Sequence, residues 1–154
     1  MISEQLKKSL QQRVETAITP REAAVDVMKE LQRHYGWLTD EAVGEAGELL
    51  GLSPLQVEEL ATFYEKIYRR PVTGKLIQVC DSISCWSGCC DGIIEHLKKR
   101  LDVELGGSSA DGKFTLVPCC CLGRCGDAPV MVIGETFYGN LTPEKVDQIL
   151  EKER

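Results

Sequence analysis

The chain has 154 residues, 43% of them hydrophobic, and a formal net charge of −6, which allows one buried core or two small ones. The acidic balance argues against nucleic-acid binding, because no basic stripe is present to neutralise phosphates. Apolar runs reach only about five residues, too few for a membrane span, and the N-terminal sequence MISEQLKKSL lacks the apolar core of a secretory signal. We therefore expect a cytosolic protein.

The first half of the sequence is predicted to be helical. Apolar residues recur every four positions over residues 2–18 (Ile2, Leu6, Leu10, Val14, Ile18), which is typical of one helical face. Capping patterns then predict helices from Pro20 to Gly36, from Thr39 to Gly51, and from Pro54 towards Ile67. Short connections between such helices favour a bundle.

The inward faces of these helices follow from the same periodicity. Val25, Met28 and Leu31 are expected to be buried on the second helix, and Phe63 with Ile67 on the fourth. The aromatic side chains Phe63, Tyr64 and Tyr68 are expected to lie in the core, as aromatic residues usually do. No catalytic group stands out in this half.

The second half alternates strands and helices. The predicted order is a strand at Lys75–Cys80, a helix at Gly88–Arg100, a Gly- and Ser-rich loop at Gly106–Gly112, strands at Phe114–Pro118, Val130–Ile133 and Thr136–Tyr138, and a helix capped by Thr142. This order suggests a small mixed sheet with helices beside it, a thioredoxin-like α/β arrangement. The strand ends would then bring two cysteine-containing loops to one end of the sheet.

All eight cysteines lie between Cys80 and Cys125, and the first 79 residues contain none. This uneven distribution predicts two domains, a helical bundle at residues 1–72 and an α/β domain at residues 73–154. A reducing cytosol disfavours structural disulfides, so metal binding or redox chemistry becomes the expected use of the thiols.

The cysteines include two local pairs, Cys80 with Cys85 (C-x4-C) and Cys121 with Cys125 (C-x3-C). A [2Fe–2S] cluster needs two thiolates on each iron, which two such pairs could supply. We expect each pair to converge on one iron from a loop without regular secondary structure. Spacing alone leaves the ligands open, because Cys85/Cys90 and Cys120/Cys125 are also C-x4-C pairs.

The sequence gives less support to other uses of the thiols. A thioredoxin-type thiol oxidoreductase needs C-x2-C, and none of the eight cysteines forms one. A zinc-stabilised structural interaction module is the alternative of a different class. Burial as small apolar residues would suit Cys89, Cys90, Cys119 and Cys120 but not the whole set.

The segments GLSPLQVEELATFYEKIYRRPV, CDSISC and DGKFTLVPCCCLGRCGDAPVMVI, followed by LTPE, together resemble the NuoE family, the small thioredoxin-like [2Fe–2S] subunit of bacterial NADH:quinone oxidoreductase (respiratory complex I). The resemblance covers about residues 20–150 and implies an N-terminal helical bundle followed by a thioredoxin-like domain. It also implies that Cys80, Cys85, Cys121 and Cys125 are the cluster ligands. Arg124, between the second pair, would oppose the negative charge of the cluster.

The sequence contains neither G-x-G-x-x-G nor a P-loop, so the chain alone is not expected to oxidise NADH. The resemblance implies an electron-transfer subunit of the peripheral arm, placed on the cytoplasmic side of the inner membrane by its complex. Its cluster would accept one electron from the FMN of a larger NADH-binding (NuoF-type) subunit. The same type of subunit also serves NAD-linked formate dehydrogenases and NAD-reducing or bifurcating hydrogenases, which remain alternatives.

Overall fold

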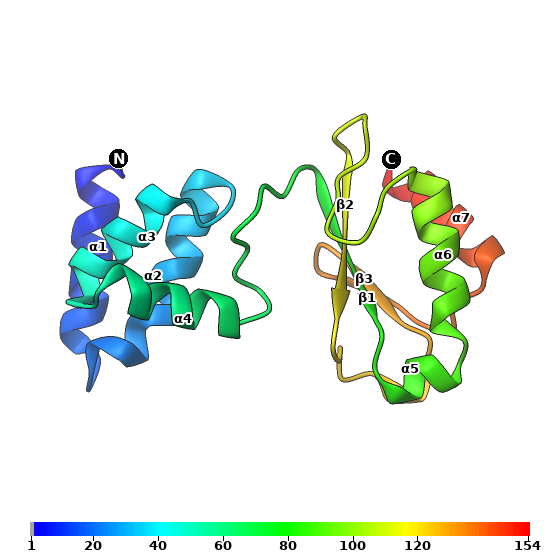
Figure 1. Cartoon of the computed structure of the whole chain (residues 1–154), viewed down its shortest axis with the longest axis horizontal. Helices are drawn as coiled ribbons and strands as arrows, with labels where there is room; N and C mark the ends of the chain where they lie inside the picture. The colour runs from blue at the N-terminus through cyan, green and yellow to red at the C-terminus, as the bar shows by residue number, and fades with distance from the viewer. Residues whose placement is uncertain (1) are drawn as a thin grey trace. The chain divides into compact units, whose positions relative to one another are not determined.

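A computed structural model of the chain describes residues 2–154. The chain divides into two compact units, which we call the helical unit (Met1–Val72) and the sheet unit (Thr73–Arg154). Figure 1 shows helices α1 to α4 in the first and all the labelled strands in the second. No helix among the described residues is long and apolar enough to cross a membrane.

The helical unit contains four helices: α1 (Glu4–Thr16), α2 (Pro20–Tyr35), α3 (Asp40–Leu50) and α4 (Pro54–Phe63). Their ends follow local capping chemistry. The side chains of Ser3, Thr39 and Ser53 accept backbone N–H groups at the starts of α1, α3 and α4, which satisfies donors that have no partner within the helix. α2 and α3 end at Gly36 and Gly51, both in the left-handed region. The four predicted helices are confirmed.

The core of the helical unit differs from the predicted one at four positions. α2 buries Val27 completely, whereas Val25 is only half-buried, because the inward stripe of α2 runs through Ala24, Val27, Met28 and Leu31. Ile18 lies beyond the end of α1 and is 92% exposed. Phe63 ends α4 with 76% exposure and Tyr64, the residue after it, is also exposed, so their predicted places in the core are wrong.

The segment after α4 folds back on its own unit. Ile67 is buried beyond the end of α4 rather than within it. The Gln32 side chain accepts the backbone N–H of Tyr68 (2.6 Å) and donates to the carbonyl of Lys66 (3.0 Å). Arg69 forms ion pairs with Glu58 and Asp40. These polar contacts hold the irregular segment against the bundle without a further helix.

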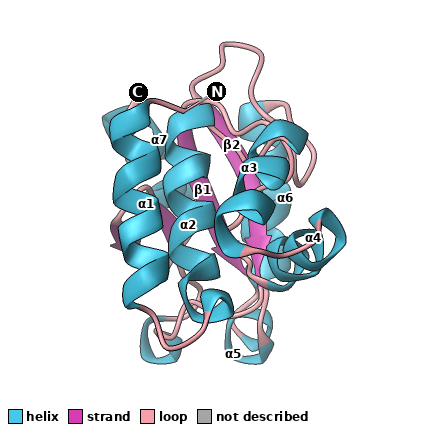
Figure 2. Cartoon of the chain, turned by 90° about the vertical axis from the view of Figure 1, so that its left-hand side faces the viewer, coloured by secondary structure: helices cyan, strands magenta, loops and turns pink. Residues whose placement is uncertain are grey.

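The sheet unit contains four strands: β1 (Lys75–Cys80), β2 (Phe114–Cys119), β3 (Met131–Ile133) and β4 (Thr136–Tyr138). Their order in the sheet is β2-β1-β3-β4. β1 and β2 are parallel, and the β1–β3 and β3–β4 pairs are antiparallel. Figure 2 shows β1 and β2 side by side in magenta. The predicted mixed sheet is confirmed.

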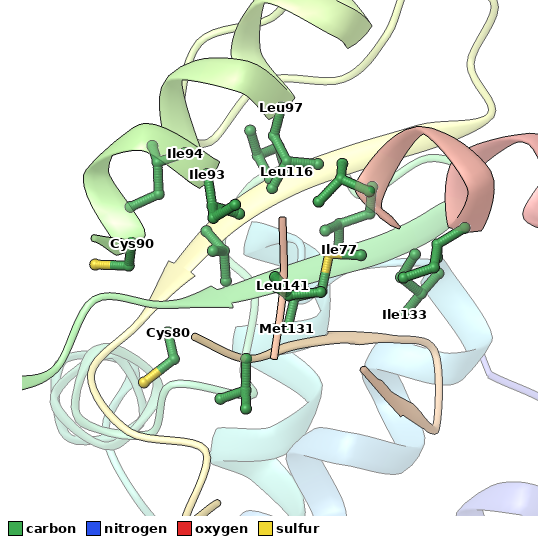
Figure 3. Close-up of a cluster of buried hydrophobic side chains, with 14 of the residues drawn as sticks. Ile77, Cys80, Cys90, Ile93, Ile94, Leu97, Leu116, Met131, Ile133 and Leu141 are labelled. Atoms are coloured by element: carbon green, nitrogen blue, oxygen red, sulfur yellow. The ribbon is translucent and has the colours of Figure 1, made fainter. Parts of the chain in front are cut away.

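The helices of the sheet unit are α5 (Ile83–Ser87), α6 (Cys90–Leu101) and α7 (Pro143–Glu153), with a short 3-10 turn, η1, at Cys125–Asp127. α6 and α7 lie on the same side of the sheet (Figure 1). Buried side chains of α6, including Ile93 and Leu97, meet Ile77, Leu116 and Met131 of the strands in one core (Figure 3). Cys80 and Cys90 lie at one end of this core (Figure 3).

Candidate metal centre

Both cysteine loops start from the same end of the sheet. β1 and β2 run parallel with Cys80 opposite Cys119, so the chain leaves both strands at one edge, as expected for parallel neighbours. β1 lies between β2 and β3, and the loop that joins β2 to β3 must therefore pass the end of β1. This loop, residues 120–130, carries Cys121 and Cys125, and we call it the second cysteine loop.

Backbone hydrogen bonds join both ends of the second cysteine loop to the end of β1. The N–H of Asp81 donates to the carbonyl of Cys119 (3.2 Å), and the N–H of Cys80 donates to the carbonyl of Val130 (3.1 Å). These bonds extend the sheet ladder past the last residue of β1. The two cysteine segments are thereby fixed to each other through the backbone.

The first pair, Cys80 and Cys85, is assembled and buried. The two residues are 2% and 1% exposed. Burial raises the pKa of Cys85 to about 11, as does its hydrogen bond with the Cys80 side chain, whereas the backbone N–H of Val130 opposes the shift. The expectation of a loop without regular structure is wrong here, because Cys85 lies within α5. One helical turn from Ser82 brings its thiol back towards β1.

The second pair is exposed. Cys121 and Cys125 both lie at the surface, and Cys125 begins the η1 turn. The N–H of Gly123 points at the Cys121 sulfur, with an N···S distance of 3.4 Å, and Gly123 adopts a φ of 75° that favours glycine. Across residues 2–154, no three His, Cys, Asp or Glu side chains are grouped closely enough to hold a metal ion. The structure therefore joins Cys80 to Cys85 but does not gather all four predicted ligands.

The tip of the second cysteine loop is anchored to the sheet by Arg124. Its guanidinium forms an ion pair with Asp127 (2.8 Å) and lies over the Phe137 ring of β4, with Cζ 5.5 Å from the ring centroid. From the sequence, Arg124 is recognisable only as a positive charge, and its partners Asp127 and Phe137 are not predicted. Nothing in the local sequence signals the Phe137 contact, because it depends on where β4 lies in the sheet.

The other four cysteines divide into buried and exposed members. Cys90 is fully buried at the start of α6, and burial, followed by the charges of Asp91 and Asp81, raises its pKa. Cys119 is 5% exposed and its thiol donates to the carbonyl of Cys121 (3.7 Å). Cys89 and Cys120 are exposed. Cys90 lies close enough to the first pair to influence the pKa of Cys85, so the ambiguity of spacing persists in three dimensions.

The donor set suits a binuclear iron–sulfur cluster. Two buried thiols in contact can ligate one iron, and the exposed loop supplies two more thiols for the other. Backbone N–H groups already point at sulfur in both halves, from Val130 to Cys85 and from Gly123 to Cys121. Such donors are the outer-shell partners that thiolate-ligated clusters use.

Known proteins point in the same direction. The profile of the family described as thioredoxin-like [2Fe–2S] ferredoxin matches residues 8–154. The chain is 38% identical to the E subunit of NADH-quinone oxidoreductase from Pseudomonas aeruginosa over 151 residues, covering 98% of this chain and 91% of that protein. It is 40% identical to the corresponding protein of Escherichia coli K12 over 133 residues, covering 86% and 80%.

A solved structure, an NAD+-reducing [NiFe]-hydrogenase in the air-oxidised state, superposes with a TM-score of 0.68 at 20% identity. The match covers 82% of this chain but only 22% of the hydrogenase chain. At this identity the likeness bears on the fold alone. With the family match, the thioredoxin-like fold and the [2Fe–2S] cofactor predicted from the sequence are confirmed.

Proposed function

Because the chain belongs to the thioredoxin-like [2Fe–2S] ferredoxin family, and within it to the NuoE-type relatives from NADH-quinone oxidoreductase, we propose that Cys80, Cys85, Cys121 and Cys125 hold its cluster. The chain is an electron-transfer subunit of that oxidoreductase. The finer assignment of ligands rests on the residues of the two loops.

The observation that carries the ligand assignment is the buried contact between the Cys80 and Cys85 thiols at the end of β1. The backbone bonds from Cys80 and Asp81 to both ends of the second cysteine loop support it. The Cys121 sulfur receives the N–H of Gly123, which supports its place in the ligand set. The Cys119 thiol instead donates to a carbonyl, as a protonated thiol does.

When bound, the cluster supplies a one-electron redox centre of net charge −2 when oxidised and −3 when reduced. The two cysteine pairs that would hold this centre differ in their exposure to solvent. Cys80 and Cys85 are shielded from water by α5 and the sheet, whereas Cys121 and Cys125 lie at the surface. An electron donor would therefore approach from the side of the second cysteine loop.

We infer that this donor is the FMN of a larger NADH-binding (NuoF-type) subunit, and that the complex holds the chain at the cytoplasmic face of the inner membrane. The sequence has neither G-x-G-x-x-G nor a P-loop, so we expect that partner to bind the nucleotide. The equivalent subunit of an NAD-reducing hydrogenase is the second candidate, and the hydrogenase superposition shows that the fold is compatible with it. The 38–40% identity to the NuoE-type relatives favours the respiratory complex.

The test is anaerobic preparation with iron and sulfide, followed by EPR of the dithionite-reduced protein. Cys121→Ala and Cys85→Ala are expected to lose the S = ½ signal. Their neighbouring controls, Cys120→Ala and Cys90→Ala, are expected to keep it. Retention in Cys121→Ala with loss in Cys120→Ala would overturn the ligand set. Stoichiometric zinc in a colourless parent protein would instead favour the structural module.

A further inference from the structure

The second cysteine loop has an anchor that its cysteines do not provide. Between Cys121 and Cys125, Leu122 packs against the core of the sheet unit, and Arg124 reaches another element with its guanidinium. It spans from the loop to Phe137 on β4, the edge strand on the opposite side of the sheet from β2. The loop leaves β2, so this contact fixes its tip across the full width of the sheet.

The partner of Arg124 is itself firmly placed. The Asp127 carboxylate receives the guanidinium, and the Asp127 N–H donates back to the carbonyl of Arg124 (3.0 Å). The Asp127 carbonyl accepts the N–H of Asn140. Asp127 therefore connects the η1 turn, which begins at Cys125, to the segment between β4 and α7.

We propose that Arg124 is a positioning residue, which fixes the placement of the Cys121 and Cys125 sulfurs through its joint contact with Asp127 and Phe137. The proposal rests on the ligand assignment made under Proposed function. The contacts of the Arg124 side chain are with Asp127 and Phe137, so it acts through the shape of the loop. The Phe137 ring is 44% exposed, and the guanidinium covers one of its faces.

A purely electrostatic role for Arg124 fits the geometry less well. Its charge is balanced by Asp127 at 2.8 Å, so the pair presents little net charge to a cluster. A planar guanidinium can bind a carboxylate and stack on a ring at the same time, whereas a lysine ammonium offers the charge without the flat face. Arg124→Lys therefore keeps the positive charge but removes the flat face, so it tests the two contributions separately.

The experiment compares Arg124→Gln, Arg124→Lys and Phe137→Leu with the parent in the reconstituted full chain. The readouts are the g-values and line width of the reduced EPR signal, the visible circular dichroism of the oxidised cluster, and the rate of bleaching by a chelator. The matched control is Arg100→Gln, which breaks another half-exposed Arg–Asp pair of the sheet unit, with Asp147 on α7.

Arg124→Gln and Phe137→Leu are both expected to broaden the EPR signal and to bleach roughly two- to fivefold faster than the parent, as suits the loss of half-exposed contacts. Arg124→Lys should fall between them and the parent, and Arg100→Gln should match the parent. A parent-like Arg124→Gln, or an Arg124→Lys indistinguishable from the parent in all three readouts, would overturn the proposal. A parent protein without any cluster signal would instead refute the ligand assignment.

Discussion

Gly139 lies directly against Asp127. A methyl group added at Gly139 would stand 2.5 Å from the Asp127 Cβ and 2.9 Å from the Asp127 carbonyl oxygen. Both distances are too short for real contacts, and one of the two atoms belongs to the backbone. The segment after β4 therefore fits against the second cysteine loop only if residue 139 has no side chain.

Gly139→Ala is accordingly expected to displace the η1 turn. Forcing a methyl group into such a contact costs about 1–3 kcal/mol, measurable as a lower urea midpoint of the full chain. The cluster should also bleach faster, because Asp127 holds the turn that begins at Cys125. Gly92→Ala is the control, since a methyl group there meets nothing within 4 Å and alanine favours the helix. Equal stability of the two variants would contradict the prediction.

Thr115→Val is expected to loosen the start of the sheet unit. The Thr115 hydroxyl is buried, donates to the carbonyl of Thr73 (2.8 Å) and accepts the N–H of Thr73 (3.0 Å), with Ser108 as a third partner (2.8 Å). Valine keeps the shape but leaves these groups without a partner, a loss of about 1–3 kcal/mol in the free energy of unfolding. Denaturant titration checks it, with the exposed strand residue Thr136→Val as the matched control.

The cysteines of the cluster-free protein should be alkylated at very different rates. The Cys85 pKa of about 11 leaves roughly a thousandth of it as thiolate at pH 8, and only the thiolate reacts. Its rate of modification by iodoacetamide should therefore rise about tenfold per pH unit between pH 7 and 10. Peptide mass spectrometry over a time course checks both points. The exposed Cys121 is expected to react before the buried Cys85. Fast modification of Cys85 at neutral pH would show that the first pair is open.

Acid stability should depend on Asp147. A hydrogen bond from His96 (3.1 Å), followed by one from Arg100 (2.9 Å), keeps the Asp147 pKa below its usual value. A carboxyl whose pKa is lower in the folded state stabilises the fold above its unfolded pKa, and this contribution is lost as the pH falls through the folded pKa. The melting temperature of Asp147→Asn should thus be lower than that of the parent at pH 6. The difference between the two melting temperatures should shrink as the pH falls below about 4. Glu135→Gln, which also removes a carboxylate but from an exposed turn, is the control and should melt like the parent at pH 6.

The sequence predicted the elements better than their exact faces. The helix and strand positions followed from periodicity and capping, because these signals are local. Val25 and Val27 are both apolar, so the sequence alone does not show which of them faces inward. The packing of α1 and α3 against α2 decides it, and Val27 is the buried one. Phe63 was expected in the core because aromatic residues usually are, yet α4 ends just there and leaves the ring in solvent.

The candidate site was predictable only in part. The spacing of the cysteines indicated two pairs, and the family match supports the cofactor. The short helix that carries Cys85 was missed, since five residues are too few for a periodic signal. The contact of Arg124 with Phe137 could not be foreseen either, because it depends on strand order rather than on neighbouring sequence.

The parallel register of β1 with β2 also bears on when the four proposed ligands can come together during synthesis. Cys80 and Cys85 leave the ribosome well before Cys121 and Cys125, and the intervening α6 crossover must dock before Cys119 stands opposite Cys80. Such long-range pairing is slow compared with helix formation. A nascent chain thus offers only half of the proposed ligand set, and the complete set becomes available to an iron–sulfur donor only after Cys125 has been synthesised and β2 has paired with β1.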